Sequence, residues 1–345
     1  MFFSNCLALL LLAPMQETNP PQRGLPAASP TGKEYIYESA PFPECHASTL
    51  LEVPGGLLAS WFGGTREKDP DVGIWMSRKT EKGWSPPVEI ADGVQSDGRR
   101  HPCWNPVLCR VPGKIVLFYK VGPNPDMWWG VRKESGDEGK TWSKAIPLPE
   151  GFLGPVKNKP VTLPSGDLLC PSSTETPEDP GQWRIHFEKV DSSLSTWVRI
   201  VPAAGNPPIE AIQPSVLFLG GSKLLALGRS KQGKLFVTSS QDQGDLWSEL
   251  GLLDVPNPNS GTDALTLKDG RHLLVYNPVN KGRTPLSVAV SGNGTTWKKF
   301  LDLETEPGEY SYPAIIQTSD GKVHILYTWK RKKIAHVTID PKQIP

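Results

Sequence analysis

Polar and ionisable side chains recur at one position of a repeated pattern in this sequence. They stand where a short apolar segment begins, and they comprise His46, Asn105, Lys159, Gln213, Asp263 and Tyr312. A second set follows the next apolar segment of several repeats and comprises Arg66, Glu67, Asp69, Lys120, Arg229, Asn277, Arg283 and Trp329. Polar groups that converge on one concavity are the usual starting hypothesis for a ligand site. The two sets therefore predict one site built from several repeats.

The basic side chains indicate which ligand such a site would take. Lys120, Lys159, Arg229 and Arg283 would make it electropositive, and a guanidinium group pairs bidentately with a planar carboxylate. We therefore expect an acidic sugar as the ligand. His46 adds acid–base chemistry close to neutral pH, although a histidine that is only hydrogen-bonded at the start of a strand fits the sequence equally well.

Short strands at a regular spacing must position these side chains. Apolar segments start at Leu57, Ile115, Leu168, Leu224, Leu273 and Val323. Each follows a hairpin turn, usually with Gly, and precedes a further strand. A period of roughly 50 residues predicts a β-propeller or another repeat array, in which equivalent positions of the blades meet at one central opening. The 33 Gly and 36 Pro suit many strands and turns and argue against long helices.

A turn that ends in Trp follows the third strand of several repeats. Its clearest copies are residues 135–142, 240–247 and 291–297, and Trp84 and Trp197 close more degenerate copies. An Asp or Asn in such a turn accepts backbone N–H groups, Gly supplies positive φ, and Trp packs beneath the blade. We assign these residues a structural role. The turns match the Ser-x-Asp-x-Gly-x-Thr-Trp Asp box, and from about residue 33 onwards the chain resembles sialidases and related BNR-repeat proteins.

The resemblance implies an all-β fold, a six-bladed β-propeller of four-stranded antiparallel blades. The sixth blade has only three strands at the C-terminus, and residues 33–37 are expected to add the fourth strand and close the ring. Closure removes exposed sheet edges. Segments 101–106, 256–263 and 309–313 also resemble a bacterial branch of sialidase-like proteins.

The resemblance also implies roles for particular residues. Tyr312 matches the family's Tyr nucleophile at the start of the last blade. Arg229 and Arg283 resemble the arginines that hold the substrate carboxylate, and Asp69 matches the acid/base Asp, with Asp71 as its nearby competitor. A phenol has a free pKa of about 10, so Tyr312 needs a base to act as a nucleophile near neutral pH.

Two positions depart from the family pattern. Residues 44–48 read Glu-Cys-His-Ala-Ser where the family places its first arginine. Gln213 stands where the family has the Glu that activates the Tyr, and an amide cannot take a proton. Glu210, Asp263 and Glu309 are candidates to replace that base.

Three functions remain open. The first is a sialidase-like exo-glycoside hydrolase that removes a terminal acidic sugar from a glycan, with Tyr312 as nucleophile or transition-state stabiliser, Asp69 as acid/base and His46 as an accessory group. The second is a polysaccharide lyase acting on uronates, in which His46 or Tyr312 abstracts a proton. The third is a non-catalytic glycan-binding propeller, which the two departures favour. The candidate substrate-binding residues are Arg229, Arg283, Lys159, Asp263, Gln213, Lys120, Asn105 and Arg66.

The N-terminal residues predict export. Residues 7–13 form an apolar run too short to span a bilayer, so residues 1–20 resemble a signal peptide, the alternative being an N-terminal apolar strand. Residues 21–32 form a Pro- and Gly-rich linker, which leaves residues 33–345 as one propeller domain. We expect a periplasmic or secreted protein with no membrane contact once the signal is removed.

Charge and cysteine usage narrow the partners and the redox chemistry. A formal net charge of +1 gives no basic field for nucleic acid. Cys45, Cys103, Cys109 and Cys170 each lie in or beside an apolar strand, so we expect buried free thiols rather than disulfides. No sequence feature calls for a metal ion or an organic cofactor.

Overall fold

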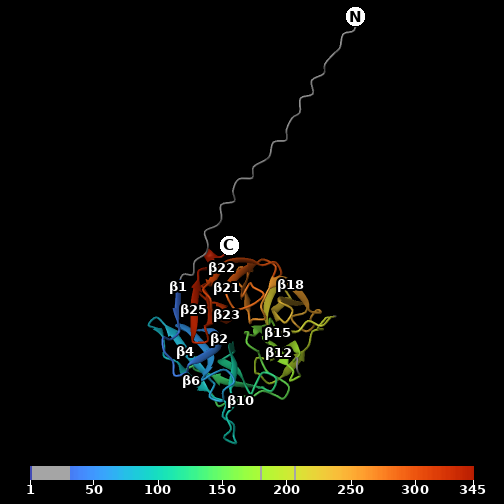
Figure 1. Cartoon of the computed structure of the whole chain (residues 1–345). Helices are drawn as coiled ribbons and strands as arrows, with labels where there is room; N and C mark the ends of the chain where they lie inside the picture. The colour runs from blue at the N-terminus through green and yellow to red at the C-terminus, as the bar shows by residue number, and fades with distance from the viewer. Residues whose placement is uncertain (2–31, 179–180, 206) are drawn as a thin grey trace.

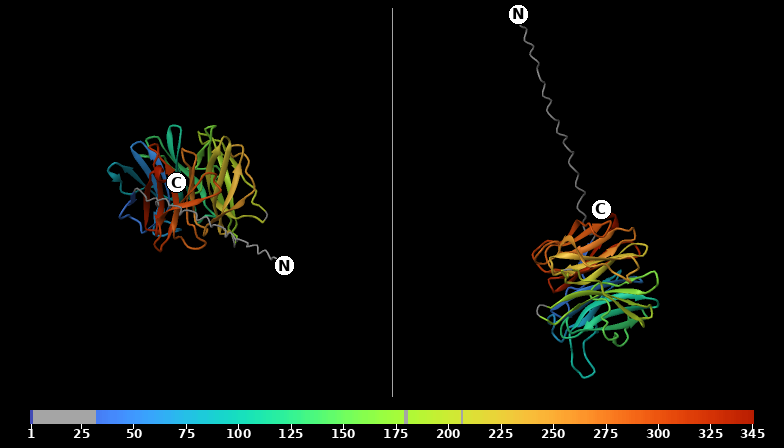
Figure 2. Two further views of the ribbon diagram at one scale, coloured as in Figure 1. Left: turned by 90° about the horizontal axis from the view of Figure 1, so that it is seen from above. Right: turned by 90° about the vertical axis from the view of Figure 1, so that its right-hand side faces the viewer.

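The computed structural model of this chain describes Met1 and residues 32–178, 181–205 and 207–345. Its strands form six antiparallel sheets arranged as the blades of a ring (Figure 1), and Figure 2 shows the same ring from two further directions. The six-bladed β-propeller expected from the sequence is confirmed. The predicted signal peptide and linker lie outside the described residues, apart from Met1 and Gly32.

The blades follow one another in chain order, and in blades 1, 4, 5 and 6 the first strand contacts both neighbouring blades. Blade 1 comprises β2 (Glu44–Val53), β3 (Gly56–Gly64), β4 (Gly73–Thr80), β5 (Gly83–Trp84) and β6 (Val88–Ala91). Blade 2 comprises β7 (Cys103–Val111), β8 (Lys114–Val121), β9 (Trp129–Ser135) and β10 (Ile146–Pro147). Blade 3 comprises β11 (Val161–Thr162), β12 (Leu168–Glu175), β13 (Trp183–Val190) and β14 (Trp197–Ile200). Blade 4 comprises β15 (Ala211–Gly220), β16 (Lys223–Ser230), β17 (Lys234–Ser240) and β18 (Gly251–Pro256). Blade 5 comprises β19 (Asp263–Thr266), β20 (His272–Tyr276), β21 (Leu286–Ser291) and β22 (Lys298–Glu304). Blade 6 comprises β23 (Tyr310–Gln317), β24 (Val323–Trp329), β25 (Lys333–Ile339) and β1 (Gly32–Tyr35).

The ring closes through the N-terminal strand. β1 pairs antiparallel with β25, and Tyr35 lies opposite Ala335. The Lys33 ammonium also forms an ion pair with Glu304 at the end of blade 5. The predicted closure is therefore confirmed, and it leaves blade 6 with four strands from the two ends of the chain (Figure 1).

Apolar side chains fill the spaces between blades. Leu58 and Ile74 of blade 1 pack with Leu117 of blade 2. The ring of Trp247 in blade 4 stacks on Phe187 in blade 3, with centroids 3.9 Å apart and 10° between the planes. Burial of one such side chain contributes about 1.5–3 kcal/mol. These interfaces hold neighbouring blades in fixed positions relative to one another.

The predicted Asp-box turns form as expected on the face where third strands end. Asp137 Oδ1 accepts hydrogen bonds from the backbone N–H groups of Lys140 and Thr141 at 3.0 and 2.9 Å, and such bonds hold the pKa of Asp137 below its usual range. Gly139 has φ +77°, and a Cβ there would lie 2.5 Å from Leu58 Cδ1. Equivalent turns in blades 3, 4 and 5 are held by Asp191, Asp242 and Asn293.

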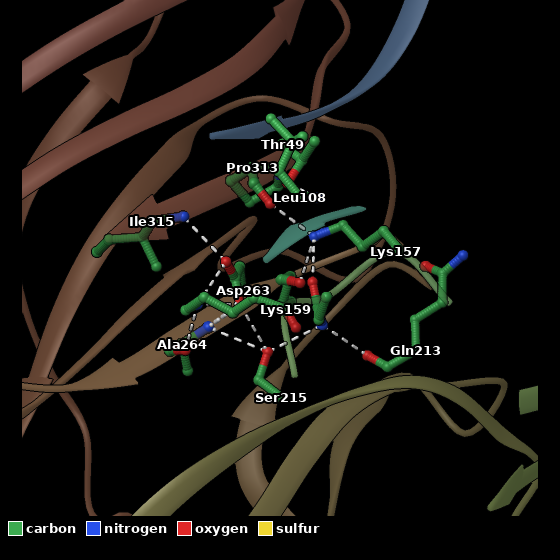
Figure 3. Close-up of polar contacts among 12 residues, drawn as sticks. Thr49, Leu108, Lys157, Lys159, Gln213, Ser215, Asp263, Ala264, Pro313 and Ile315 are labelled. Carbon is green, nitrogen blue, oxygen red and sulfur yellow. Dashed lines mark hydrogen bonds and ion pairs between the residues drawn. The ribbon is translucent and has the colours of Figure 1, made fainter. Parts of the chain in front are cut away.

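An ion pair joins four blades inside the ring. Asp263 accepts both hydrogen bonds that Lys159 Nζ donates to it, at 3.0 and 2.9 Å (Figure 3). The same carboxylate accepts from Ser215 Oγ at 3.0 Å and from the Ile315 N–H at 2.9 Å. Asp263 is 2 % exposed and fully bonded. This pair is part of the framework of the propeller, although the sequence placed it at the site.

The four described cysteines are buried free thiols, as predicted. Within residues 32–345, the masked positions excepted, no helix is long and apolar enough to cross a membrane. In the same residues no three His, Cys, Asp or Glu side chains gather in a way that could hold a metal ion.

Candidate functional site

The antiparallel register brings the two predicted sets of side chains to one face of the ring. His46 on β2 lies opposite Phe62 near the end of β3, and Ile212 on β15 lies opposite Arg229 near the end of β16. Tyr310 on β23 lies opposite Trp329, the last residue of β24. We call this face, where first strands begin and second strands end, the mouth.

A bulge in the first strand shapes the mouth in four blades. The register breaks at the same place in β2, β7, β15 and β23, where two residues lie unpaired. The first residue of each bulge has positive φ, namely Ala47 (55°), Asn105 (36°), Gln213 (57°) and Tyr312 (50°). A residue other than Gly in this region is strained, and such strain gathers at functional sites.

The bulges correct the predicted alignment of the repeats. Ala47 is the equivalent of Tyr312, so His46 lies one residue before the aligned position. In blades 3 and 5 the left-handed residues at the entry are Lys157 (φ 80°) and Asn259 (φ 58°), not Lys159 and Asp263. Extra bulge residues shift the strand relative to a simple count, and a shift of one residue moves a side chain to the other face.

Tyr312 lies at the centre of the cluster. Gln213 Nε2 donates a hydrogen bond to its hydroxyl oxygen at 3.3 Å, and the His46 ring centroid is 4.0 Å from the Tyr312 ring centroid. The Arg229 guanidinium carbon and the Lys157 ammonium nitrogen lie 5.6 and 5.8 Å from the same ring centroid. Cations and polar groups from three other blades therefore surround this one phenol.

Gly261 confirms how closely three of these side chains converge. A Cβ on Gly261 would lie 3.2 Å from a Tyr312 ring carbon and 3.3 Å from Gln213 Oε1 and from Lys157 Cε. Lys157 itself is buried, and its ammonium donates to the carbonyl of Pro313 at 2.6 Å (Figure 3). Lys157 thus supports the backbone directly after Tyr312.

His46 is a buried, neutral imidazole. Its Nδ1 hydrogen-bonds with Thr328 Oγ1 at 2.9 Å, while Nε2 is buried with no hydrogen-bond partner. Burial, followed by the charges of Arg331, Arg283 and Arg229, holds the pKa of His46 well below its usual range. His46 is therefore uncharged at neutral pH, and its Nε2 is left without a protein partner beside Tyr312.

Arg229 and Arg283 both reach the cluster, as the sequence predicted. Arg229 is 7 % exposed, and its Nε has no hydrogen-bond partner. Arg283 Nη1 likewise lacks a hydrogen bond, and its nearest carboxylate oxygen, Glu309 Oε1, is 4.0 Å away. Buried donors without partners need an explanation, and a bound anion supplies one.

A third arginine, which the sequence analysis missed, comes from the hairpin between β24 and β25. The Arg331 carbonyl accepts the N–H of Cys45, so this residue lies against the start of blade 1. Its guanidinium pairs with Glu67 and donates from Nε to Glu309 at 2.8 Å. Arg331 thus brings a guanidinium to the blade that lacks the family's first arginine. The basic run at 330–332, in the loop after a second strand, was the available signal.

The three carboxylates proposed to replace the family's Glu are engaged elsewhere. Glu210 accepts from Lys231 at 2.9 Å, and Glu309 binds Arg331. Asp263 is bonded inside the ring, as described above. Among the described residues, the Tyr312 hydroxyl accepts its hydrogen bond from an amide, so the structure also places Gln213 where the family has the activating Glu.

The loop between β3 and β4 carries both acidic candidates of blade 1. Asp71 accepts from the Thr65 N–H at 2.9 Å and from its hydroxyl at 2.8 Å, which fixes the turn. Asp69 is the freer carboxylate, and Arg66 Nη2 lies 3.4 Å from its Oδ1. The Arg66 side chain is 72 % exposed, so it is largely in solvent.

Lys120 and Asn105 do not provide the free polar groups that the sequence predicted. Lys120 is 0 % exposed, and its ammonium donates to the carbonyl of Pro155 in the interior between blades 2 and 3. Burial lowers the pKa of Lys120 to about 7. Asn105 occupies the bulge position but is 4 % exposed. The prediction for Lys120 is wrong, because its side chain is fully buried and its ammonium is bonded to the Pro155 carbonyl.

The described residues also form a hollow that the sequence analysis missed. It adjoins the mouth, has a volume of about 400 Å³, and takes its walls from the loops of blades 1 to 4. Glu175, the last residue of β12, and Trp183, the first residue of β13, line it. Glu175 is the last residue of the second strand in blade 3, and Arg229 is the last but one in blade 4. This shared position in the repeat could have identified Glu175 from the sequence.

Comparison with known proteins places this geometry in a family. A family model described as a BNR repeat-like domain matches residues 55–325. No curated protein matches the chain.

Solved structures share its fold. A protein of unknown function from Dyadobacter fermentans is 16% identical with a TM-score of 0.75, and the match covers 92% of this chain and 100% of that one. The NanB sialidase from Streptococcus pneumoniae is 13% identical with a TM-score of 0.70, over 90% and 71% of the two chains. The intramolecular trans-sialidase from Ruminococcus gnavus is 13% identical with a TM-score of 0.70, over 93% and 99%.

Proposed function

The chain belongs to the BNR repeat-like domain family, whose propellers resemble sialidases, and on this premise we propose that it is an exo-glycoside hydrolase acting on acidic glycans. The proposed reaction releases a terminal sugar that carries a carboxylate, such as sialic acid. We also propose that the protein is exported, in line with its apolar N-terminal run.

One observation carries the proposal. Arg229, Arg283 and Arg331 come from different blades and converge beside Tyr312 and His46. The Arg229 guanidinium carbon lies 5.6 Å from the Tyr312 ring centroid, and Arg283 and Arg331 lie 4.0 and 2.8 Å from the same oxygen, Glu309 Oε1. Two of these guanidinium groups hold buried donor atoms without hydrogen-bond partners. A carboxylate ligand would satisfy those donors in charge-assisted, bidentate hydrogen bonds.

Tyr312 is the proposed reacting group. With the sugar carboxylate among the arginines, the phenol oxygen would support the positive charge that develops at the anomeric carbon. A covalent bond to that carbon requires the phenol to lose its proton, and His46 Nε2 is the unpartnered base beside it.

The test is product analysis after incubation with sialosides, uronides and rhamnosides. We expect release of a carboxylate-bearing monosaccharide, and a loss of about 10²–10⁴-fold in turnover for Tyr312→Phe. Tyr310→Phe, a buried tyrosine on the same strand, is the matched control and should retain turnover. Full turnover by a folded Tyr312→Phe variant would contradict the proposed role.

A lyase acting on uronates is the second candidate. It is favoured by the contact between neutral His46 and Tyr312, together with an amide rather than a carboxylate on the phenol. In this reaction one of the two side chains abstracts a proton and the arginines neutralise the uronate. Ultraviolet absorbance from an unsaturated uronate distinguishes elimination from hydrolysis. Glycan binding without any product would instead identify a non-catalytic propeller.

A further inference from the structure

The hollow beside the arginines offers room for a second part of a ligand. Its lining is mostly polar and includes Lys68, Asn124, Asp126, Glu175, Trp183 and Lys231. Asn124 Oδ1 is buried there without a hydrogen-bond partner. Polar groups around a concavity of this kind suit a hydroxyl-rich ligand such as a sugar.

Glu175 stands where the hollow meets the reacting cluster. It lies directly opposite Trp183 in the register of β12 and β13, and the Trp183 side chain hydrogen-bonds its carboxyl group. The Arg229 guanidinium carbon is 5.0 Å from the Trp183 ring centroid and 5.6 Å from the Tyr312 ring centroid. Trp183, which lies opposite Glu175, and Tyr312 therefore flank the same arginine.

The surroundings of Glu175 favour its protonated form. Burial raises the pKa of this carboxyl, and the charge of Asp126 acts in the same direction. Arg229, Lys231 and the Trp183 hydrogen bond act against it without reversing the shift. A carboxyl group that keeps its proton to higher pH is suited to donate it in catalysis.

We propose that Glu175, rather than Asp69, is the proton donor of this site, and that the hollow receives the leaving group. This inference rests on the proposed hydrolase. Asp69, which the family resemblance favours, pairs with the exposed side chain of Arg66. Glu175 lines the hollow, whereas of the loop that carries Asp69 it is Lys68 that lines it.

In the proposed step, the bond between the anomeric carbon and the glycosidic oxygen breaks, and its electron pair stays on the oxygen. That oxygen takes the Glu175 proton and leaves as an alcohol. Water then adds to the anomeric carbon and gives a proton to the Glu175 carboxylate, which restores the acid.

Leaving-group dependence tests the assignment. Glu175→Gln and Asp69→Asn are compared on a natural alkyl-linked acidic glycoside and on the 4-nitrophenyl glycoside of the same sugar, whose leaving group needs no proton. We expect Glu175→Gln to lose at least about 100-fold on the natural linkage and less than about tenfold on the aryl glycoside. Asp254→Asn, at a side chain 98 % exposed on β18, controls for loss of one negative charge.

Circular dichroism must first show that the variants are folded. Each kinetic outcome then supports or contradicts the assignment of Glu175 as proton donor. Equal losses on both substrates for Glu175→Gln, or the selective loss in Asp69→Asn instead, would overturn the assignment. Wild-type protein that releases no product from either substrate would overturn the proposed hydrolase itself, which is a distinguishable result.

Trp183→Phe gives a second readout that a structural role would not move. Removing the indole N–H removes a hydrogen bond that lowers the pKa of Glu175. The alkaline limb of the rate profile should then shift to higher pH, because an acid with a higher pKa stays protonated longer. An unmoved limb, or a shift to lower pH, would contradict the proposal.

Discussion

The two faces of this propeller use polar side chains in opposite ways. On the Asp-box face, Asp137 accepts two backbone N–H groups and two hydroxyl groups, from Thr141 and Ser135. At the mouth, Gln213 Oε1, Arg229 Nε and Arg283 Nη1 are buried without partners. Orphan atoms occur elsewhere too, such as the Trp61 indole nitrogen, but at the mouth they surround one phenol.

The contrast separates structure from function better than residue type does. Lys159 and Asp263 have the charges expected of a binding site, yet each is bonded to framework atoms. Arg229 has the same kind of charge, and part of its donor capacity is unused. A satisfied polar group stabilises the fold, whereas an unsatisfied buried one costs stability, and at the mouth a bound ligand could satisfy it.

The largest expected effect tests the satisfied side of this contrast. Asp263→Ala leaves the Lys159 ammonium and the Ile315 N–H without their acceptor. We expect the free energy of unfolding to fall by about 3 kcal/mol, the lower end for breaking a buried pair, since Lys159 is a quarter exposed. Denaturant unfolding measures it.

A matched pair at the surface gives the control. Asp254→Asn breaks the exposed pair with Lys234 and should cost less than about 1 kcal/mol. If Asp263→Ala lowered the free energy of unfolding as little as this control, Asp263 would not be part of the framework. The contrast between the two faces would then be wrong for this residue.

The next effect tests the unsatisfied side. Arg229→Gln should lower kcat/KM for the acidic glycoside about 10–150-fold, the equivalent of 1.5–3 kcal/mol for a hydrogen bond to a charged group. The free energy of unfolding should stay level or rise, because a buried charge with an unpartnered Nε is removed. Steady-state kinetics and thermal unfolding give the two values.

Arg199→Gln, on the outer strand of blade 3, serves as the control for that variant. It should change neither value appreciably. A fall in stability for Arg229→Gln without a kinetic loss would make Arg229 a structural residue.

The sequence predicted the Asp-box face more completely than the mouth. The Asp boxes were predictable because every group of the turn around Asp137 or Asn293 lies within a few residues of the next. Tyr312, Arg229 and Arg283 were found because the repeat gives their positions, and in blade 6 the bulge begins at Tyr312 itself. These signals are local or periodic, so they can be recognised in a single sequence.

The rest depends on three-dimensional features that the repeat does not encode. A bulge displaced His46 from the expected alignment, since its extra residue changes which side chain faces the mouth. In blade 3 the left-handed residue at the entry is Lys157 and not Lys159. Arg331 reaches blade 1 from the opposite end of the chain, through ring closure. The burial of Lys120 and of Glu175 depends on neighbouring blades that no local pattern specifies.

The smallest expected effect uses a substitution that the chain itself contains. Asp242 Oδ1 accepts the Leu246 N–H at 3.0 Å in blade 4, and Asn293 Oδ1 accepts the Thr296 N–H at 2.8 Å at the same place in blade 5. Because the amide oxygen does this work in blade 5, Asp242→Asn should change the free energy of unfolding by less than about 0.5 kcal/mol. Asp242→Ala removes the acceptor and should cost about 1 kcal/mol, with turnover per folded molecule unchanged. Chemical denaturation of the two variants side by side measures the difference. If Asp242→Asn lowered the free energy of unfolding as much as Asp242→Ala, the charge and not the hydrogen bond would hold the turn. The Asp-box face would then depend on charge, as the mouth does.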